Sequence, residues 1–534
     1  MSRVRVPSAA PLSFVAKNPS EYKNSLQAMN TTTSQENRRH DLDALRAFAM
    51  LLGIVLHGAL SMAPIPWLVE DDVRSHGMGM LNHFIHVFRM PLFFLLSGYF
   101  SMLLWQRRGL GGLLRQRALR IFLPLFVAIF TVLPLLAISV PVAWGLSEDA
   151  KAPGGGPSSL HWAVGHGDVE ECERLLESGS DPNLGDDRGS TPLHWAIFFG
   201  REQAALTLVD AGADLKRKNV DGRTPLDELM EPWTPEVRSI CEFLSSLLQL
   251  EVDLDEVPAA RARIATSIGL EAPMLVSSEE LNKEETKSAF ELGHLWFLWY
   301  LTLLTSLLAP LFALLARASH RLSQAAASPL TMLALIPATA FLLKSMSNST
   351  GYPLFGPNTS IVLKPDLLIL TFYGLFFGFG ALLRLVDPDT RRITRRWPVW
   401  ILIALVAFPM ALHATFEPQD GETSMGAWAA LLQAVACWGL VIGLLGAFQR
   451  VLSKESRFAR LVSDSSYWIY LMHLPLVIIL QGLVSHWQAS AVLKLLTTCS
   501  ITFVALFATY LVFVRPTPIG WMLNGRQPRR KKVD

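Results

Sequence analysis

Residues 121–144 read IFLPLFVAIFTVLPLLAISVPVAW and contain no charged side chain. A helix rises 1.5 Å per residue, so about 20 apolar residues cross the hydrocarbon core of a bilayer. This stretch meets that length. It therefore predicts a transmembrane helix, and the same test applies to the rest of the chain.

The composition favours a membrane protein over several soluble domains. Of 534 residues, 51% are hydrophobic and only 17% are charged, whereas soluble domains carry roughly a quarter charged residues. The sequence predicts an all-α, polytopic transmembrane helical bundle of about ten spans, of which 329–343 is the shortest. The candidate spans are 42–62, 83–105, 121–144, 292–315, 329–343, 365–385, 398–414, 425–448, 465–483 and 491–514.

Basic residues are concentrated in alternate loops between these segments. Positive charge near the ends of spans favours the cytoplasmic side, and the intervening loops are neutral or acidic. We therefore expect both termini in the cytoplasm and a location in the bacterial inner membrane. The basic groups are Arg38 and Arg39; Arg107, Arg108, Arg115, Arg117 and Arg120; Arg317 and Arg321; Arg391, Arg392, Arg395 and Arg396; Arg450, Lys454, Arg457 and Arg460; and Arg529, Arg530, Lys531 and Lys532.

The formal net charge is only +2. Such a balance produces no global field that would favour nucleic acid. Membrane lipid is the expected surrounding of the chain, and we expect no nucleic-acid partner.

A repeated motif interrupts the apolar pattern after the third span. Thr191-Pro192-Leu193-His194-Trp195-Ala196 is followed thirty-three residues later by Thr224-Pro225-Leu226-Asp227, and a weaker copy begins at Ser159. Thr-Pro provides a helix cap and a pre-set first residue, and glycine ends a helix in a left-handed turn. The motif and period resemble the ankyrin repeat, a turn plus two helices, and predict an inserted α-solenoid of two to three repeats.

These patterns divide the chain into six parts. We expect a disordered N-terminal tail (1–36), the first part of the membrane domain (37–146), the ankyrin-repeat insertion (147–250), a linker (251–290), the second part of the membrane domain (291–520) and a basic cytoplasmic tail (521–534). The insertion follows an odd-numbered span, so we expect it in the periplasm. A miscounted span would place it in the cytoplasm instead.

His57 is an ionisable residue within the first span. It lies past the midplane, because the helix from Asp43 to His57 covers roughly 21 Å. An ionisable side chain at membrane depth is costly and is by default a functional hypothesis. The alternative is a neutral imidazole that hydrogen-bonds to a neighbouring helix.

Several segments, in this order, resemble the membrane-bound acyltransferase 3 family, and most of all its branch of periplasmic glucan succinyl-transferases. The resemblance covers the whole membrane portion, and the ankyrin insertion departs from the usual plan. The segments are Arg39-His40-Asp41-Leu42-Asp43-Ala44-Leu45-Arg46 leading to His57; Phe88-Arg89-Met90-Pro91-Leu92-Phe93-Phe94; Arg117-Ala118-Leu119-Arg120; His294-Leu295-Trp296-Phe297-Leu298; Ser466-Tyr467-Trp468-Ile469-Tyr470-Leu471-Met472-His473; and Val514-Arg515-Pro516.

This resemblance implies transfer of an acyl group across the membrane. The donor substrate would be cytosolic acyl-CoA, and the acceptor would be a hydroxyl group of a glycan or other envelope molecule. The reaction needs a base for the hydroxyl proton, and imidazole suits this role because it titrates near working pH. We expect His57 to be that base, and the acyl group to be acetyl or succinyl.

Arg117 and Arg120 are candidates for holding the phosphates of the donor. They lie three residues apart at the start of a span and would share one helical face. Guanidinium groups bind phosphate through paired hydrogen bonds. The remaining arginines of this loop can be explained by topology alone.

The other candidate residues have structural alternatives. His294, Tyr470 and His473 could bind the acceptor or form hydrogen bonds between helices. Asp43 and Arg46 are three residues apart and could form an ion pair, a supporting role.

His83 and His86 share a helical face, but no third ligand has a spacing that fixes a metal site. We therefore expect neither a metal nor a bound cofactor. Two alternative functions stay open: a transporter or flippase without covalent chemistry, and a membrane-anchored interaction protein whose ankyrin repeats bind a protein partner.

Overall fold

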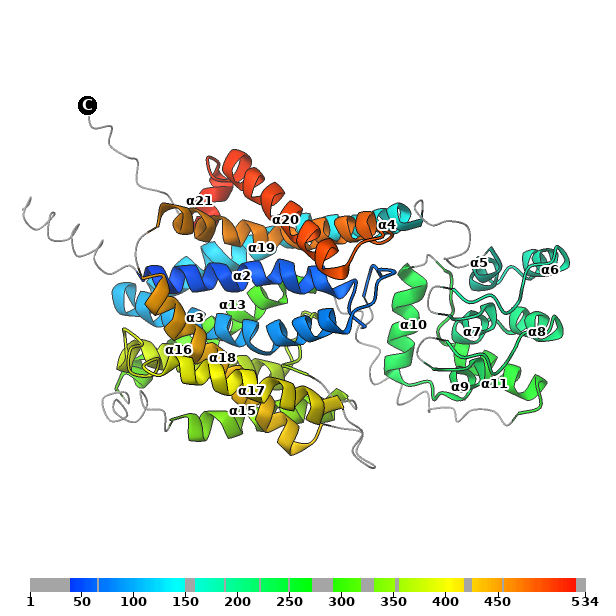
Figure 1. The fold of residues 1–534 in the computed structure, drawn as a ribbon, viewed down its shortest axis with the longest axis horizontal. Helices are drawn as coiled ribbons and strands as arrows, with labels where there is room; N and C mark the ends of the chain where they lie inside the picture. The colour runs from blue at the N-terminus through cyan, green and yellow to red at the C-terminus, as the bar shows by residue number, and fades with distance from the viewer. Residues whose placement is uncertain are drawn as a thin grey trace, which may run out of the picture.

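The structure is a computed structural model that describes residues 39–64, 67–148, 159–186, 189–219, 222–247, 250–270, 292–317, 331–350, 355–416, 425–453 and 456–524. These ranges form helices and no β-strand, as Figure 1 shows. The predicted tail 1–36 lies outside them, as do 271–290 of the predicted linker and 525–534 of the predicted basic tail.

The predicted spans coincide with helices. Among the described residues, eight helical runs are long and apolar enough to cross a membrane, and one of them, His76–Ala143, contains two predicted spans in 68 residues. Met332–Asn348 is a shorter apolar helix. The helices are α2 (His40–Leu60), α3 (His76–Arg117), α4 (Leu123–Glu148), α13 (Trp296–Leu308), α15 (Met332–Thr350), α16 (Leu367–Val386), α17 (Trp397–Phe416), α18 (Ala427–Val451), α19 (Arg457–Val484) and α20 (Ala491–Thr509).

Short irregular segments complete the bundle. Gly109 interrupts α3 with a φ of 66°, a conformation that glycine adopts without steric cost. The chain therefore bends after the second span and carries its arginine-rich segment along the end of the bundle. The remaining elements are the π-helical turn η1 (Ala118–Phe122), the 3₁₀ turns η2 (Gly293–Leu295) and η3 (Ala309–Leu311), the π-helical turn η5 (Tyr510–Val514) and α21 (Pro518–Asn524).

The relative directions of α2, α3 and α19 agree with the predicted order of the spans. α2 and α19 run parallel, because Asp43 contacts Ser463 near their starts and His57 contacts His473 further along. α2 and α3 run antiparallel, because Arg39 contacts Tyr99 while Asn82 contacts Leu56. The first and ninth predicted spans thus share one direction, and the second opposes them.

The close packing of α3 on α16 depends on two glycines. A Cβ at Gly98 would overlap the carbonyl of Phe377, and a Cβ at Gly380 would overlap the carbonyl of Leu95. Small residues let transmembrane helices approach until their backbones touch. This pair therefore fixes where α3 and α16 cross.

The inserted module consists of helix pairs that pack on one another. Its helices are α5 (Ser159–His166), α6 (Val169–Glu177), α7 (Pro192–Phe198), α8 (Glu202–Asp210), α9 (Pro225–Met230), α10 (Pro235–Leu247) and α11 (Val257–Ser267). α11 falls in the stretch expected to be linker, yet it places Ile264 and Ala265 in the core shared by α5 to α9. The module therefore extends beyond residue 250.

The 33-residue period appears as a repeated hydrogen bond. His161 Nε2 donates to the carbonyl of Ser190 over 2.9 Å, and His194 Nε2 donates to the carbonyl of Arg223 over 3.2 Å. Each histidine thus ties its own helix to the turn of the next repeat. Thr191 and Thr224 begin α7 and α9 with proline as the next residue and a capping box, as predicted.

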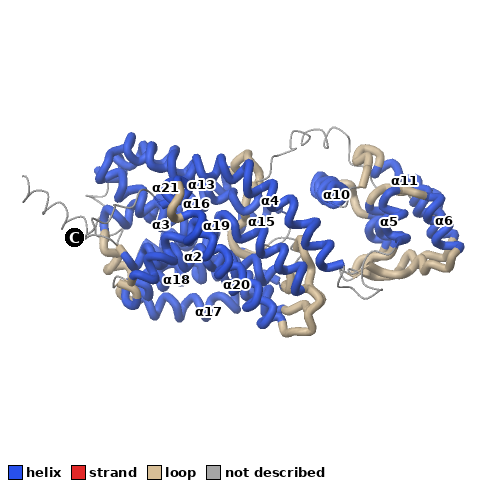
Figure 2. The backbone as a smooth tube through the Cα atoms, turned by 90° about the horizontal axis from the view of Figure 1, so that it is seen from above, coloured by secondary structure: helices blue, strands red, loops and turns tan. Residues whose placement is uncertain are grey.

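The module lies at one end of the helical bundle. Figures 1 and 2 show it beyond the end where α4 finishes, whereas the start of α2 and the short helix α21 lie at the opposite end. The start of α2 and all of α21, the first and last described helices of the membrane domain, thus lie at one end of the bundle, and the insertion lies at the other end.

We predict that Gly380→Ala destabilises the bundle, because the new methyl group meets a backbone carbonyl that cannot move without shifting α3. Overpacking of this kind costs about 1–3 kcal/mol. The thermal unfolding midpoint of detergent-purified protein measures it. Gly378→Ala is the matched control, since nothing lies within 4 Å of a Cβ at that position of the same helix. Equal midpoints for the two variants would contradict the prediction.

We predict that the ankyrin module becomes less stable as pH rises from about 4.5 to about 7. Burial raises the pKa of the Glu228 carboxyl from its usual 4.5 to about 7, and its Oε2 atom is buried without a hydrogen-bond partner. In this window the folded module keeps a proton that the unfolded chain releases. Glu228→Gln, which stays neutral, should remove the dependence.

Hydrogen exchange of the α9 amides in the full-length protein, corrected for the intrinsic effect of pH, provides the measurement. Glu242→Gln, an exposed position on α10, is the control and should behave as the wild type. A slope that persists in Glu228→Gln would assign the pH dependence to another group.

Candidate active site

His57 and His473 form a direct contact between α2 and α19. The two nitrogens His57 Nδ1 and His473 Nε2 are 2.8 Å apart, and the rings stack with centroids separated by 5.0 Å. His473 is 1% exposed, whereas His57 is half-buried in the last turn of α2. His57 is therefore the more exposed member of the pair.

The hydrogen bonds fix which nitrogens carry protons when both rings are neutral. His473 Nδ1 lies 2.7 Å from the carbonyl of Tyr470, and a carbonyl can only accept, so this nitrogen carries the proton. His473 Nε2 must then accept from His57 Nδ1–H. The remaining nitrogen, His57 Nε2, is left with a free lone pair, which is the state of a general base.

Two residues that the sequence did not single out hold His57 in place. The Trp67 indole stacks on the imidazole at 6.0 Å with only 9° between the planes. Gln481 accepts from Trp67 Nε1 over 3.0 Å and donates to the carbonyl of His57 over 2.8 Å. The loop after α2 and the end of α19 thus orient the His57 ring.

His294 and Tyr470 lie beside this pair and connect η2 to α19. The Tyr470 hydroxyl donates to the carbonyl of His294 over 2.7 Å, and His294 Nε2 donates to the carbonyl of Leu471 over 3.1 Å. The His294 ring stands edge-on to His473 at 5.4 Å. His294 Nδ1 is buried without a partner in the part of the chain that the structure describes. The four predicted residues His57, His294, Tyr470 and His473 therefore meet at one place, where these hydrogen bonds between helices hold His294 and Tyr470.

Arg89 is a charged neighbour of the histidines that the sequence analysis quoted but gave no role. It lies on α3, and its Nη1 atom is 3.0 Å from the point where a Cβ on Gly53 would stand, which is also 3.4 Å from His473 Nε2. The signal that could have found it is a lone arginine within an apolar span.

Arg117 and Arg120 lie at the opposite end of the bundle. Arg117 Nη2 donates to Ser101 Oγ over 2.8 Å, and its Nε is buried without a partner among the described residues. Arg46 and Arg120 are close enough to repel Arg117. Arg120 itself lies in the π-helical turn η1. These three residues, Arg46, Arg117 and Arg120, form an arginine cluster.

The predicted pairing of Arg46 with Asp43 is confirmed, at 3.7 Å. Because Arg46 and His57 share α2 and are eleven residues apart, the cluster lies about 16 Å from the histidines along the helix. Arg46 thus forms an ion pair with Asp43 and also lies in the arginine cluster.

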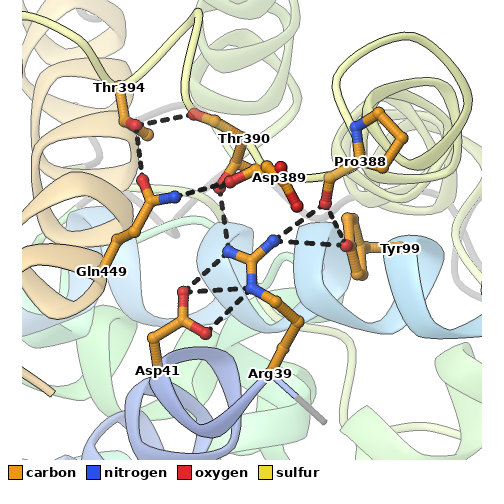
Figure 3. A network of polar contacts seen from close by, with 8 residues as sticks. All are labelled: Arg39, Asp41, Tyr99, Pro388, Asp389, Thr390, Thr394 and Gln449. Carbon is orange, nitrogen blue, oxygen red and sulfur yellow. Dashed lines mark hydrogen bonds and ion pairs between the residues drawn. The ribbon is translucent and has the colours of Figure 1, made fainter. Parts of the chain in front are cut away.

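A polar network fastens the start of α2 to the turn between α16 and α17, as Figure 3 shows. Arg39 pairs with Asp41 at 2.7 Å and donates to the carbonyl of Pro388 over 2.8 Å. Tyr99 donates to the same carbonyl over 2.5 Å. A cavity of about 680 Å³ adjoins this network, and its walls include Arg391, Arg395 and Arg450. Basic loops predicted to share one side of the membrane therefore meet there.

These features define a polytopic helical membrane protein with a histidine pair near one end and an arginine cluster near the other. A family model described as an acyltransferase domain matches residues 39–165 and 280–514, more than half of the chain. The chain belongs to the acyltransferase 3 family and is an acyltransferase, as the resemblance predicted. A model of three ankyrin repeats matches residues 135–227.

The chain is also similar to a named curated protein. Glucans biosynthesis protein C from Salmonella paratyphi B, Salmonella heidelberg and Salmonella agona is 40% identical to it over 101 residues. The match covers 19% of this chain and 25% of each relative, so the chain spans about a quarter of the length of these relatives. The similarity agrees with the predicted glucan-modifying branch.

We predict that His473→Phe lowers acyl transfer by about 10²- to 10⁴-fold, the usual range for losing general base catalysis. The substitution removes the acceptor that keeps the proton of His57 on Nδ1. Transfer of a labelled acyl group by purified, reconstituted protein is the measurement.

Tyr470→Phe is the matched control, because His473 bonds to the main-chain carbonyl of residue 470 and keeps that contact. It loses one hydrogen bond, to His294, worth about 1 kcal/mol or a few-fold in rate. A loss as large as that of His473→Phe would contradict the prediction, because it would show that the Tyr470 phenol matters as much as the hydrogen bond between His57 and His473.

Proposed function

We propose that this acyltransferase moves an acetyl or succinyl group from cytosolic acyl-CoA to a hydroxyl group of a periplasmic glycan or another envelope acceptor. The observation that carries the proposal is the separation of two sites along α2. A base that can activate a hydroxyl group lies near one end, and the arginine cluster lies near the other. Acyl-CoA carries its phosphates and its thioester at opposite ends of an extended arm, so one molecule could occupy both.

The proposed step uses residues whose geometry is described above. His57 Nε2 takes the proton of the acceptor hydroxyl as the oxygen attacks the thioester carbonyl. The proton on His57 Nδ1 stays on the hydrogen bond to His473, which stabilises the imidazolium that forms. Arg46, Arg117 and Arg120 would hold the donor phosphates, since guanidinium groups bind phosphate well. Direct attack requires no covalent intermediate on the enzyme.

The proposed orientation puts both termini in the cytoplasm of a bacterial inner-membrane protein and the ankyrin module in the periplasm. Two observations support it: the arginine-rich loops lie at the end where α2 starts, and the module lies at the other end (Figure 1). The module would then share a compartment with the acceptor, and a protein or glycan partner bound to its repeats would be near the histidines. The name of the curated relatives supports a glucan as the acceptor.

We predict that His57→Ala abolishes transfer of labelled acetyl or succinyl from acyl-CoA to an oligosaccharide acceptor. The loss should reach at least about 10²-fold, since the variant lacks the base. Inside-out vesicles, which expose the cytoplasmic face, should use added acyl-CoA, and right-side-out vesicles should not. His83→Ala, a histidine of α3 packed against Phe355 and Phe416, is the control and should retain activity.

Two results would contradict the proposal. Normal transfer by His57→Ala would remove the catalytic role, and use of acyl-CoA by right-side-out vesicles would reverse the orientation.

A further inference from the structure

Arg89 is a cation inside the membrane domain. It is half-buried, and among the residues that the structure describes its Nε atom is buried without a hydrogen-bond partner. Within the described ranges, no carboxylate pairs with it. The phenols of Tyr470 and Tyr373 lie near it, and their hydroxyls donate to the carbonyls of His294 and Asn358. These phenols stay neutral and cannot compensate the charge.

An unpaired charge inside the membrane domain costs free energy unless an anion compensates it. Charged side chains within membrane spans almost always pair with one another or face a functional path. A cation that lacks an internal partner is suited to an anion that comes and goes, such as the charge that develops during a reaction.

The position of Arg89 relative to the base narrows the choice of anion. Its Nη1 and His473 Nε2 flank the same point above Gly53, and Gly53 lies one helical turn before His57 on the same face of α2. A methyl group at residue 53 would stand only 3.0 Å from Arg89 Nη1, so glycine leaves room for the guanidinium against the helix. Arg89 is therefore next to His57, on the side towards the arginine cluster.

We propose that Arg89 is a further catalytic residue, which stabilises the oxyanion formed from the thioester carbonyl. The inference rests on the proposed acyl transfer. As the acceptor oxygen bonds to the carbonyl carbon, the carbonyl π electrons move to oxygen, and the Arg89 guanidinium donates to that oxygen. The carbon–sulfur bond then breaks, CoA leaves as the thiolate, and the proton held by His57 passes to the sulfur. The products are the ester and CoA thiol.

A second anion could in principle occupy this position, namely the free carboxylate of a succinyl group. The donor arm would reach His57 from the arginine cluster, so the atoms that lie beside Arg89 are those around the thioester. The distal end of the acyl group would lie beyond Arg89, on the side away from the arginine cluster. The oxyanion thus fits the location of Arg89 better than a distal carboxylate does.

The test compares Arg89→Gln and Arg89→Lys with wild type, using acetyl-CoA and succinyl-CoA in reconstituted vesicles. Arg89→Gln should lower kcat by about 10²- to 10³-fold, as for loss of one oxyanion donor, equally for both donors and with a donor KM within a few-fold of wild type. Arg89→Lys keeps the positive charge but not the planar set of N–H donors of guanidinium, and its kcat should lie between those of wild type and Arg89→Gln. The thermal unfolding midpoint of Arg89→Gln should be equal to or above that of wild type, because no ion pair is lost.

Arg384→Gln is the matched control. Arg384 also has a buried Nε without a partner, but it faces Tyr99 at the other end of the bundle, so its loss should leave kcat within a few-fold.

Three results would overturn the inference. A loss confined to succinyl-CoA would assign Arg89 to the acyl carboxylate, a rise in KM alone would assign it to donor binding, and a lowered midpoint with proportional loss of activity would assign it to folding. If wild type transfers neither acyl group, the proposed function itself is wrong. In the three results above, by contrast, wild type is active and only the role of Arg89 is wrong.

Discussion

The hydrogen bond between His57 and His473 depends on the register of two helices that are far apart in sequence. α19 contacts the backbone of α2 at both ends of their interface, through Ser463 to the carbonyl of Asp43 at 3.2 Å and through Gln481 to the carbonyl of His57 at 2.8 Å. A shift of one residue would move either contact out of range, since each residue rises 1.5 Å. The 2.8 Å distance between His57 Nδ1 and His473 Nε2 is therefore set by side chains outside the histidine pair.

The loop after α2 is held by a second long-range contact. Lys494 of α20 pairs with Asp71 at 2.6 Å, and both side chains are almost fully buried. Removing one partner of such a pair leaves an uncompensated charge, which is strongly destabilising. The same Lys494 donates to the carbonyl of Ser485, so α19, α20 and the loop meet at one point. This anchor fixes the loop that places Trp67 on the His57 ring, and the environment of His57 thus depends on α20.

Local sequence patterns predicted the helices, whereas the contacts within the candidate site depend on tertiary structure. Run length located the spans, and the Thr-Pro motif with its 33-residue period located the ankyrin helices, because these features depend on neighbouring residues. The predicted His57, His294, Tyr470 and His473 meet in space, but only the structure shows that a carbonyl of Tyr470, and not its phenol, orients His473. Trp67 and Gln481 escaped notice because they contact each other across more than 400 residues of sequence. Arg89 showed a local signal, a charge within an apolar span, but only the structure shows that it lies near His473. α11 escaped notice because its stretch carries no repeat motif.

The histidine pair avoids a problem that a carboxylate partner would create in this environment. An aspartate behind His57 would be an anion taken out of water, which costs several kcal/mol unless it is well compensated. The carbonyl of Tyr470 sets the same tautomer through His473 without adding charge. With Arg89 nearby, however, protonation of His57 would place two cations together. Under the proposed role of Arg89, that repulsion is relieved when the oxyanion forms, so proton removal and attack on the carbonyl favour one another. Under this proposal, His57 accepts a proton most readily when an acyl donor is bound.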